Sequence, residues 1–139
     1  MIINHLGEII SYFVTPGNVS DGNKDVLEKI MENIFGKVIA DKGYVGRFKN
    51  FYNRGITIIH GLRSNMKNQL ISLFDKLLLR QRNIIETVFG ILKKDFNLEH
   101  SRHRSLSGFF INIFTTISAY AFRPKKPALK MAKAGFLND

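Results

Sequence analysis

Residues 37–41 have the sequence Lys-Val-Ile-Ala-Asp, a short apolar run that ends at a carboxylate. A second run of this kind, Ile-Thr-Ile-Ile-His, occupies residues 56–60. Glycine precedes both runs, and short β-branched runs bounded by glycine are typical of buried strands. The two runs therefore predict two strands, with Asp41 at the end of the first.

Strand and helix patterns alternate along the rest of the chain. β-branched and aromatic runs predict an N-terminal hairpin that turns at Leu6-Gly7-Glu8. Amphipathic segments predict helices, the first of them capped by Asp21 or Asn23. Residues 63–74 have few periodic positions and predict a loop or a marginal surface helix. The order predicts an α/β fold, with strands at 2–3, 9–14, 37–40 and 56–60 and helices at 25–35, 47–53, 77–96 and 105–122.

The charge balance indicates a polyanionic partner. The chain has 139 residues, a formal net charge of +10 and 45% hydrophobic residues. Of the 21 basic residues, 11 follow Leu79, against 4 of the 11 acidic residues. Clustered Lys and Arg gain free energy by releasing counterions from phosphates, so nucleic acid is the expected partner.

The length and the apolar content predict one globular unit. We expect a single domain over residues 1–123, followed by a basic, loosely ordered tail over residues 124–139. No cysteine is present, no apolar run reaches the roughly 20 residues that span a bilayer, and no signal peptide is evident at Met1. A cytoplasmic protein without a membrane partner is the simplest interpretation.

The predicted helix at 77–96 carries a carboxylate between cations. At 100° per residue, Arg82, Glu86 and Lys93 fall within about 40° of one another on the face opposite the apolar stripe. A solvated polar face with a weak i, i+4 ion pair is one interpretation. A site in which Glu86 meets a metal ion and the cations meet phosphates is the other. Periodicity alone favours the solvated face.

Asp41 and Glu86 together have the chemistry of a metal-dependent DNA-cutting site. Cleavage of a phosphodiester by two divalent ions needs several carboxylates that converge on ions about 4 Å apart. Mg²⁺ prefers hard oxygen ligands, and rigid elements hold such ligands well. Taken alone, Asp41 fits an ordinary turn-capping aspartate better, so the combination carries the hypothesis.

Two motifs in order resemble those of DDE transposases. Ala40 to Tyr44 reads Ala-Asp-Lys-Gly-Tyr and is similar to the second-aspartate motif of this group. Arg82-x3-Glu86-x6-Lys93 is similar to the glutamate signature Tyr-x2-Arg-x3-Glu-x6-Lys, except that Leu79 replaces the tyrosine. Further motifs resemble the IS982 insertion-sequence family specifically, at residues 15–19, 100–105, 119–120 and 125–127.

The resemblance implies a fold and a set of roles. The fold would be ribonuclease H-like, a mixed sheet flanked by helices. Asp41 would be the second catalytic aspartate and Glu86 the catalytic glutamate, both ligands of Mg²⁺, for which Mn²⁺ is a possible substitute. Lys93 would contact the DNA backbone near the cut, and Arg82 would orient the glutamate or a phosphate.

The first catalytic aspartate of the resembled family has no counterpart in this sequence. It lies on a strand that precedes the predicted hairpin. Glu8 and Asp21 are the nearest carboxylates, but each belongs to a turn. We therefore expect a catalytic domain truncated at its N-terminal edge, without the part that recognises specific DNA ends.

Basic residues outside the signature are candidates for contact with the DNA backbone, although a solubilising surface explains them almost as well. The aromatic side chains of the predicted helix at 105–122 surround it almost entirely, which favours core packing. The DNA-contact candidates are Arg63, Lys67, Arg80, Arg102 and Arg104.

The main hypothesis is a transposase that cuts and joins DNA, with transposon ends and target DNA as partners. The alternative is a catalytically inactive remnant that binds DNA nonspecifically through its basic half. In either case a homo-oligomer or a complementary N-terminal fragment is a possible partner, and DNA binding would associate the protein with a bacterial nucleoid.

Overall fold

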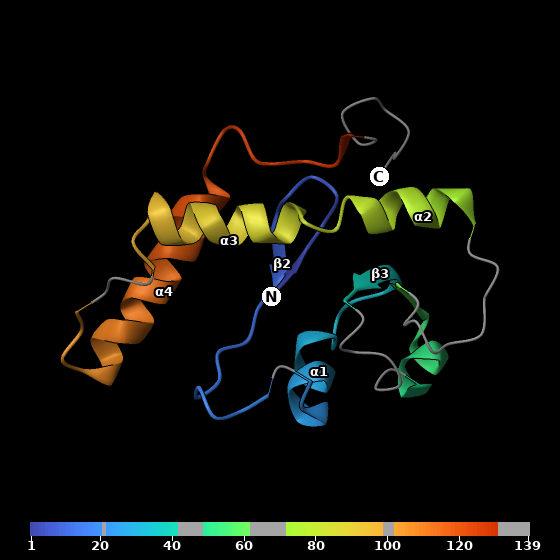
Figure 1. Ribbon diagram of the computed structural model, residues 1–139. Coiled ribbons are helices and arrows are strands. Elements are labelled where there is room, and N and C mark those ends of the chain that lie inside the picture. The colour runs from blue at the N-terminus through green and yellow to red at the C-terminus, as the bar shows by residue number, and fades with distance from the viewer. Residues whose placement is uncertain (21, 42–48, 62–71, 99–101, 131–139) are drawn as a thin grey trace. The chain divides into compact units, whose positions relative to one another are not determined.

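A computed structural model describes residues 1–20, 22–41, 49–61, 72–98 and 102–130. They form two compact units, one of Met1 and Ser11–Arg82 and the other of Ile2–Ile10 and Asn83–Asp139. Both units combine helices with strands. In chain order the elements are β1 (Ile2–Ile3), β2 (Ile9–Ser11), α1 (Lys24–Ile30), β3 (Gly36–Ala40), the 3₁₀ helix η2 (Lys49–Arg54), β4 (Ile56–His60), α2 (Leu73–Arg80), α3 (Ile84–Lys94) and α4 (Leu106–Ala121) (Figure 1).

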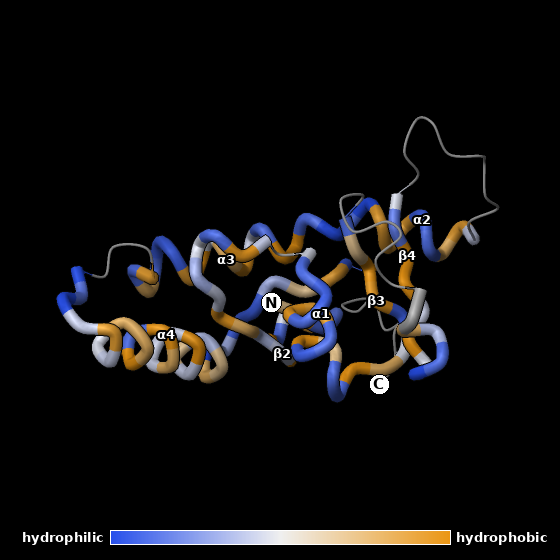
Figure 2. Tube along the Cα trace, turned by 90° about the horizontal axis from the view of Figure 1, so that it is seen from below, coloured by the Kyte–Doolittle hydropathy of each residue, from blue (hydrophilic) through white to orange (hydrophobic). Residues whose placement is uncertain are grey.

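The sheet of the first unit confirms the two strands predicted from the apolar runs. β3 and β4 pair in parallel, with Gly36 opposite Ile56 and Ala40 opposite His60. Both strands are strongly hydrophobic (Figure 2). The buried side chains of the core around them are Leu27, Ile30, Met31, Phe51, Ile56, Ile58, Ile59 and Leu78.

Helix α1 begins where its cap predicts and ends earlier than expected. The Asn23 side chain accepts a hydrogen bond from the Asp25 N–H at 2.9 Å, as an N-cap should. The predicted end at residue 35 is wrong, because the chain leaves the helix after Ile30. The Arg54 guanidinium donates to the Met31 and Glu32 carbonyls at 3.3 and 3.0 Å. These bonds add to the turn that follows the helix, in which the Met31 carbonyl also accepts from the Ile34 N–H at 3.2 Å.

The long helix predicted at 77–96 is two helices. α2 ends at Arg80 and α3 begins at Ile84, with a turn at residues 81–83. The Gln81 N–H donates to the Leu78 carbonyl at 3.0 Å, an i to i−3 closure that ends α2. α2 contacts β4 in the first unit and α3 contacts α4 in the second. The two halves therefore bury their apolar faces in different cores.

The second unit begins with the predicted hairpin, in which β1 pairs with β2. β2 ends at Ser11, before the predicted residue 14. Gly7 lies in the turn with φ of 76°, a conformation that side chains disfavour, and a Cβ there would collide with the Pro127 carbonyl oxygen. The Leu129 N–H donates to the His5 carbonyl at 2.9 Å, so this stretch of chain packs beside the hairpin.

Helix α4 confirms the last predicted helix. The Ser105 hydroxyl accepts from the Gly108 N–H at 3.1 Å and caps its start. The buried side chains Ile113, Thr116 and Tyr120 lie on one face, with the i, i+3, i+7 spacing of a helix that is covered on one side. Val88 and Leu92 of α3 are also buried in this unit, 0% and 1% exposed.

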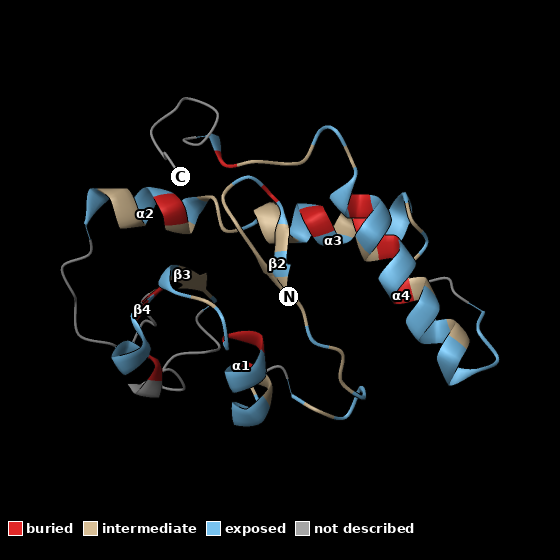
Figure 3. Ribbon diagram, turned by 180° about the vertical axis from the view of Figure 1, so that it is seen from behind, coloured by how far each residue is buried: buried red, intermediate tan, exposed pale blue. Residues whose placement is uncertain are grey.

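The expectation that the aromatic side chains of α4 all pack in the core is wrong. Tyr120 is buried, but four phenylalanines are exposed because α4 is covered along one face (Figure 3). A helix that is apolar all round gives no indication from its pattern of which face is covered. The exposed phenylalanines are Phe109, Phe110, Phe114 and Phe122.

None of the helices among the described residues is long and apolar enough to cross a membrane.

Candidate functional site

Asp41 lies directly after β3, at the edge of the parallel sheet where the carboxyl ends of both strands meet. Its side chain is 64% exposed, and its Oδ1 accepts a hydrogen bond from the Arg82 Nη1 at 3.0 Å. Because both groups are solvent-accessible, this ion pair adds little to stability. Its structural effect is to orient a strand-end carboxylate that solvent can reach.

Arg82 does not share a helical ridge with Glu86. It lies in the turn between α2 and α3, and its guanidinium contacts Asp41. The ridge predicted from 100° steps assumed one continuous helix, so this part of the prediction is wrong. Arg82, which belongs to the glutamate signature, instead contacts Asp41, the aspartate of the other motif.

Glu86 lies in the first turn of α3 and is exposed. A carboxylate is stabilised there by the partial positive charge of the helix N-terminus. Within the described parts of the chain, no hydrogen bond or ion pair is recorded for its carboxylate, which leaves both oxygens accessible to an external cation. Asp41 belongs to the first unit and Glu86 to the second.

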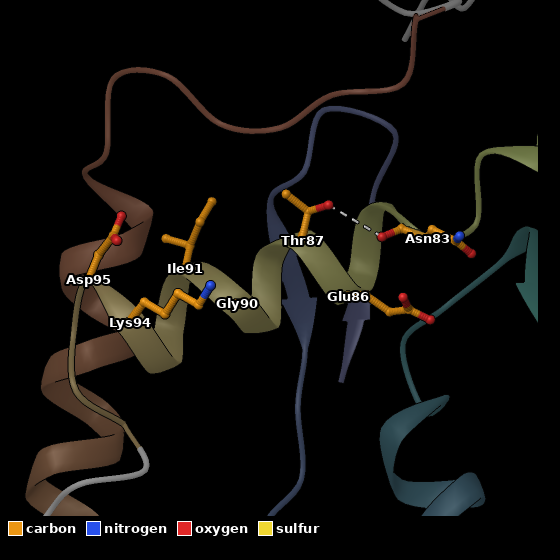
Figure 4. Close-up of a pocket in the computed structure, with 7 residues that line it drawn as sticks. All are labelled: Asn83, Glu86, Thr87, Gly90, Ile91, Lys94 and Asp95. Carbon is orange, nitrogen blue, oxygen red and sulfur yellow. Dashed lines mark hydrogen bonds between the residues drawn. The ribbon is translucent and has the colours of Figure 1, made fainter.

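Glu86 also lines an open groove on α3 that sequence reasoning missed (Figure 4). At 100° per residue from Glu86, Gly90 lies at about 40°, Lys94 at about 80° and Lys93 at about −20°. The groove follows the side of Gly90 and Lys94, whereas Lys93 lies on the other side of Glu86. The signal that points to it is a glycine one turn after the glutamate. Its lining residues are Asn83, Glu86, Thr87, Gly90, Ile91, Lys94 and Asp95.

The predicted phosphate-binding residues are exposed wherever the structure describes them. Lys93 lies in the last turn of α3 and Arg80 in the last turn of α2. Arg102 and Arg104 precede α4. All four side chains are accessible to a large anionic partner. The other candidates, Arg63 and Lys67, and residues 42–44 of the aspartate motif lie outside the described residues.

The donor atoms of Asp41 and Glu86 fit a hard divalent cation. Both offer accessible carboxylate oxygens, which Mg²⁺ and Mn²⁺ accept as ligands. In the described ranges, no group of three or more His, Cys, Asp or Glu side chains is placed to hold a metal ion. The two carboxylates are therefore considered as contributors to a site and not as a complete one.

The comparison with protein families decides the assignment. A family model described as Transposase DDE domain matches residues 1–106, about three-quarters of the chain, including Asp41, Arg82, Glu86 and Lys93. The chain belongs to the DDE transposase family. No curated protein and no solved structure matches it. DDE transposase domains generally use divalent metal ions in DNA transposition. Asp41 and Glu86 both lie within the matched stretch.

Proposed function

We propose that this chain acts in metal-dependent cleavage and strand transfer of DNA, with Asp41 and Glu86 as metal ligands. The observation that carries the proposal is the DDE transposase match over a stretch that contains both carboxylates. Their accessibility and their positions at the ends of regular elements support it. The further motifs at residues 15–19, 100–105, 119–120 and 125–127 extend the proposal to the IS982 family. The resemblance also extends it to a ribonuclease H-like fold, to which the parallel β3–β4 pair is suited.

Each protein group has a separate task in this proposal. A bound Mg²⁺ or Mn²⁺ supplies Lewis acidity that activates the attacking water or 3′-hydroxyl and offsets charge on the phosphate. Asp41 and Glu86 hold that cation in place. Arg82 donates to the Asp41 Oδ1 and fixes the orientation of its carboxylate. Lys93 binds a phosphate of the DNA backbone as a point charge.

The wider DNA contact rests on charge. The chain carries a formal charge of +10, and the exposed Arg80, Arg102 and Arg104 are suited to phosphates because they need no base-specific geometry. Transposon ends and target DNA are the proposed partners. The same charge supports a second candidate function, nonspecific DNA binding without cleavage, since two carboxylates alone are fewer than a two-metal site uses.

Nicking of a supercoiled plasmid by the purified chain tests the proposal. The wild type should nick the plasmid in the presence of Mg²⁺ or Mn²⁺ and not in EDTA. Asp41→Asn and Glu86→Gln should each lower the nicking rate at least about 100-fold, which is the typical effect of removing a catalytic group. Glu28→Gln is the matched control, because Glu28 is an exposed carboxylate that pairs only loosely with Lys24 at 3.7 Å.

Three results separate the candidates. Nicking that both substitutions abolish and the control retains supports the metal-ligand assignment. Salt-sensitive DNA binding without nicking in the wild type favours the second candidate function. Nicking that persists in Asp41→Asn or Glu86→Gln contradicts the proposed roles.

A further inference from the structure

Gly90 occupies the interior of α3, where glycine is unfavourable. Glycine in a helix interior destabilises it relative to alanine, because the glycine backbone loses more conformational freedom on folding. A Cβ built at Gly90 meets no atom of the described residues within 4 Å, and the φ of Gly90 is not in the left-handed region. Neither packing nor backbone conformation therefore requires a glycine here. The open space above it is available to a molecule outside the chain.

Gly90 forms the floor of the groove on α3. We call it the Gly90 groove, and the seven residues given above line it. Its volume is roughly 470 Å³, and most of this space is open to solvent. In Figure 4 the Lys94 side chain runs back along α3 towards Gly90, while Glu86 points away from it. Side chains on a helix lean towards its N-terminus, so this direction is the expected one for Lys94.

The charges of the Gly90 groove favour an anion at its Lys94 end. Asp95, the carboxylate beside Lys94, is paired with the Arg123 Nη1 at 2.6 Å, which offsets its charge. Within the described residues, no ion pair is recorded for the Lys94 ammonium. Glu86 and Lys94 are eight residues apart, a separation of about 12 Å along the helix. The groove thus has a carboxylate at one end, a cation at the other and a floor without a side chain between them.

We propose that the Gly90 groove holds the backbone of one DNA strand, with Lys94 bound to a phosphate and Gly90 allowing the strand to approach α3. The proposal rests on the proposed function, in which Glu86 acts at the phosphate to be cut. At a rise of about 3.4 Å per nucleotide, 12 Å spans about three to four nucleotides. Lys94 therefore fixes the strand that far from the reacting phosphate, as a DNA-positioning residue additional to Lys93.

Binding of the full chain to a fluorescein-labelled DNA duplex, measured by anisotropy in EDTA over a range of NaCl concentrations, tests this inference. Lys94→Gln should lower the slope of log K against log salt by about 0.9, the value for one phosphate contact. Lys24→Gln is the matched control, since it removes the same charge from an exposed helix position in the first unit. Its slope should stay within about 0.3 of the wild-type value.

Substitutions at Gly90 separate the groove from charge alone. Gly90→Ala should raise Tm by about 3 °C, because alanine favours the helix and meets no atom. It should nevertheless weaken DNA binding about threefold, and the larger Gly90→Leu should weaken it about tenfold, since both fill the floor on which the strand lies. A gain in stability with a loss of binding is not expected from a structural role alone.

Two results overturn the inference. One is wild-type affinity in both Gly90→Ala and Gly90→Leu, which shows that nothing occupies the floor of the groove. The other is a salt slope of Lys94→Gln that equals that of Lys24→Gln. Because binding is measured in EDTA, the affinities and salt slopes do not depend on nicking. They can be interpreted even if Asp41 and Glu86 are not metal ligands. A negative result for the Gly90 groove, in turn, does not bear on the roles of Asp41 and Glu86.

Discussion

Removal of one hydroxyl group from the core of the second unit should destabilise that unit measurably. Tyr120 is fully buried, and its hydroxyl donates to the Gly7 carbonyl at 2.6 Å, which joins α4 to the N-terminal hairpin. Tyr120→Phe removes the donor and leaves a buried carbonyl without that partner. A neutral hydrogen bond contributes about 1 kcal/mol, and an unsatisfied buried group costs about 1 kcal/mol more. We expect a loss of about 2 kcal/mol in the free energy of unfolding, or about 7 °C in Tm.

Urea unfolding followed by circular dichroism measures this loss, and Tyr52→Phe is the control. Tyr52 is 60% exposed, so its substitution should change the free energy of unfolding by no more than about 0.5 kcal/mol. A Tyr120→Phe value within about 0.5 kcal/mol of wild type would refute the assignment of this bond as a structural link.

The same tyrosine gives a pH signature. Burial raises the pKa of Tyr120 above its ordinary value of 10.0, and this effect outweighs the opposing charge of Arg123. The stability that depends on the protonated hydroxyl is fully present below pH 10.0 and falls as the pH rises above it, because the unfolded chain releases the proton first. Tyr120→Phe should lose less stability than wild type between neutral pH and this alkaline range.

Three further predictions concern the fold and its electrostatics. Gly7→Ala should cost about 2 kcal/mol or more in urea unfolding, because an L side chain is strained at φ of 76° and its Cβ collides with the Pro127 carbonyl; an unchanged midpoint would contradict the turn geometry. Ser105→Ala should cost about 1 kcal/mol through loss of the α4 cap, and Ser105→Asp should restore most of it. A hydrogen bond from Lys37 lowers the pKa of the Asp75 carboxyl below its ordinary value of 3.8, so the stability that it confers is present above that pH and lost as the pH falls further. Lys37→Gln should flatten this acid-range loss, and an identical acid titration of stability in wild type and variant would show that the pair has no such effect.

Local sequence signals predicted the elements whose causes are local. β3 and β4 contain short β-branched runs, and a glycine with positive φ begins β3 (Gly36) and precedes β4 (Gly55). α4 begins at Leu106, close to the start that the sequence predicts, and the Ser105 hydroxyl caps it. In these places neighbouring residues supply both the propensity and the boundary, so the pattern is sufficient.

The break between α2 and α3 has a cause that lies far away in the sequence. The polar residues at 81–83 fit a continuous helix as well as a turn. Leu78 packs in the first unit and Val88 in the second, and Arg82 pairs with Asp41, which is 41 residues away. Helical periodicity contains none of these tertiary contacts, which is why it placed Arg82 on the wrong ridge.

Sequence motifs pointed to the two acidic residues of the candidate site, whose role as metal ligands stays a prediction, and gave no indication of the groove beside one of them. Motif order identified Asp41 and Glu86, and the DDE transposase match contains both. The glutamate signature contains Lys93, whereas Lys94 and not Lys93 lines the groove beside Glu86. Gly90 lines that groove, and a glycine one turn after a glutamate is a weak signal beside charged motif residues.

The most direct test of the account is Mn²⁺ binding by the full chain, followed through water proton relaxation in wild type, Asp41→Asn, Glu86→Gln and the double variant. If both carboxylates serve one metal site, each single substitution should weaken binding about tenfold or more, and the double variant should lose less than the two losses combined. The control Glu28→Gln should bind Mn²⁺ as the wild type does. Equal binding of Mn²⁺ by the wild type and the double variant would contradict the assignment of Asp41 and Glu86 as metal ligands.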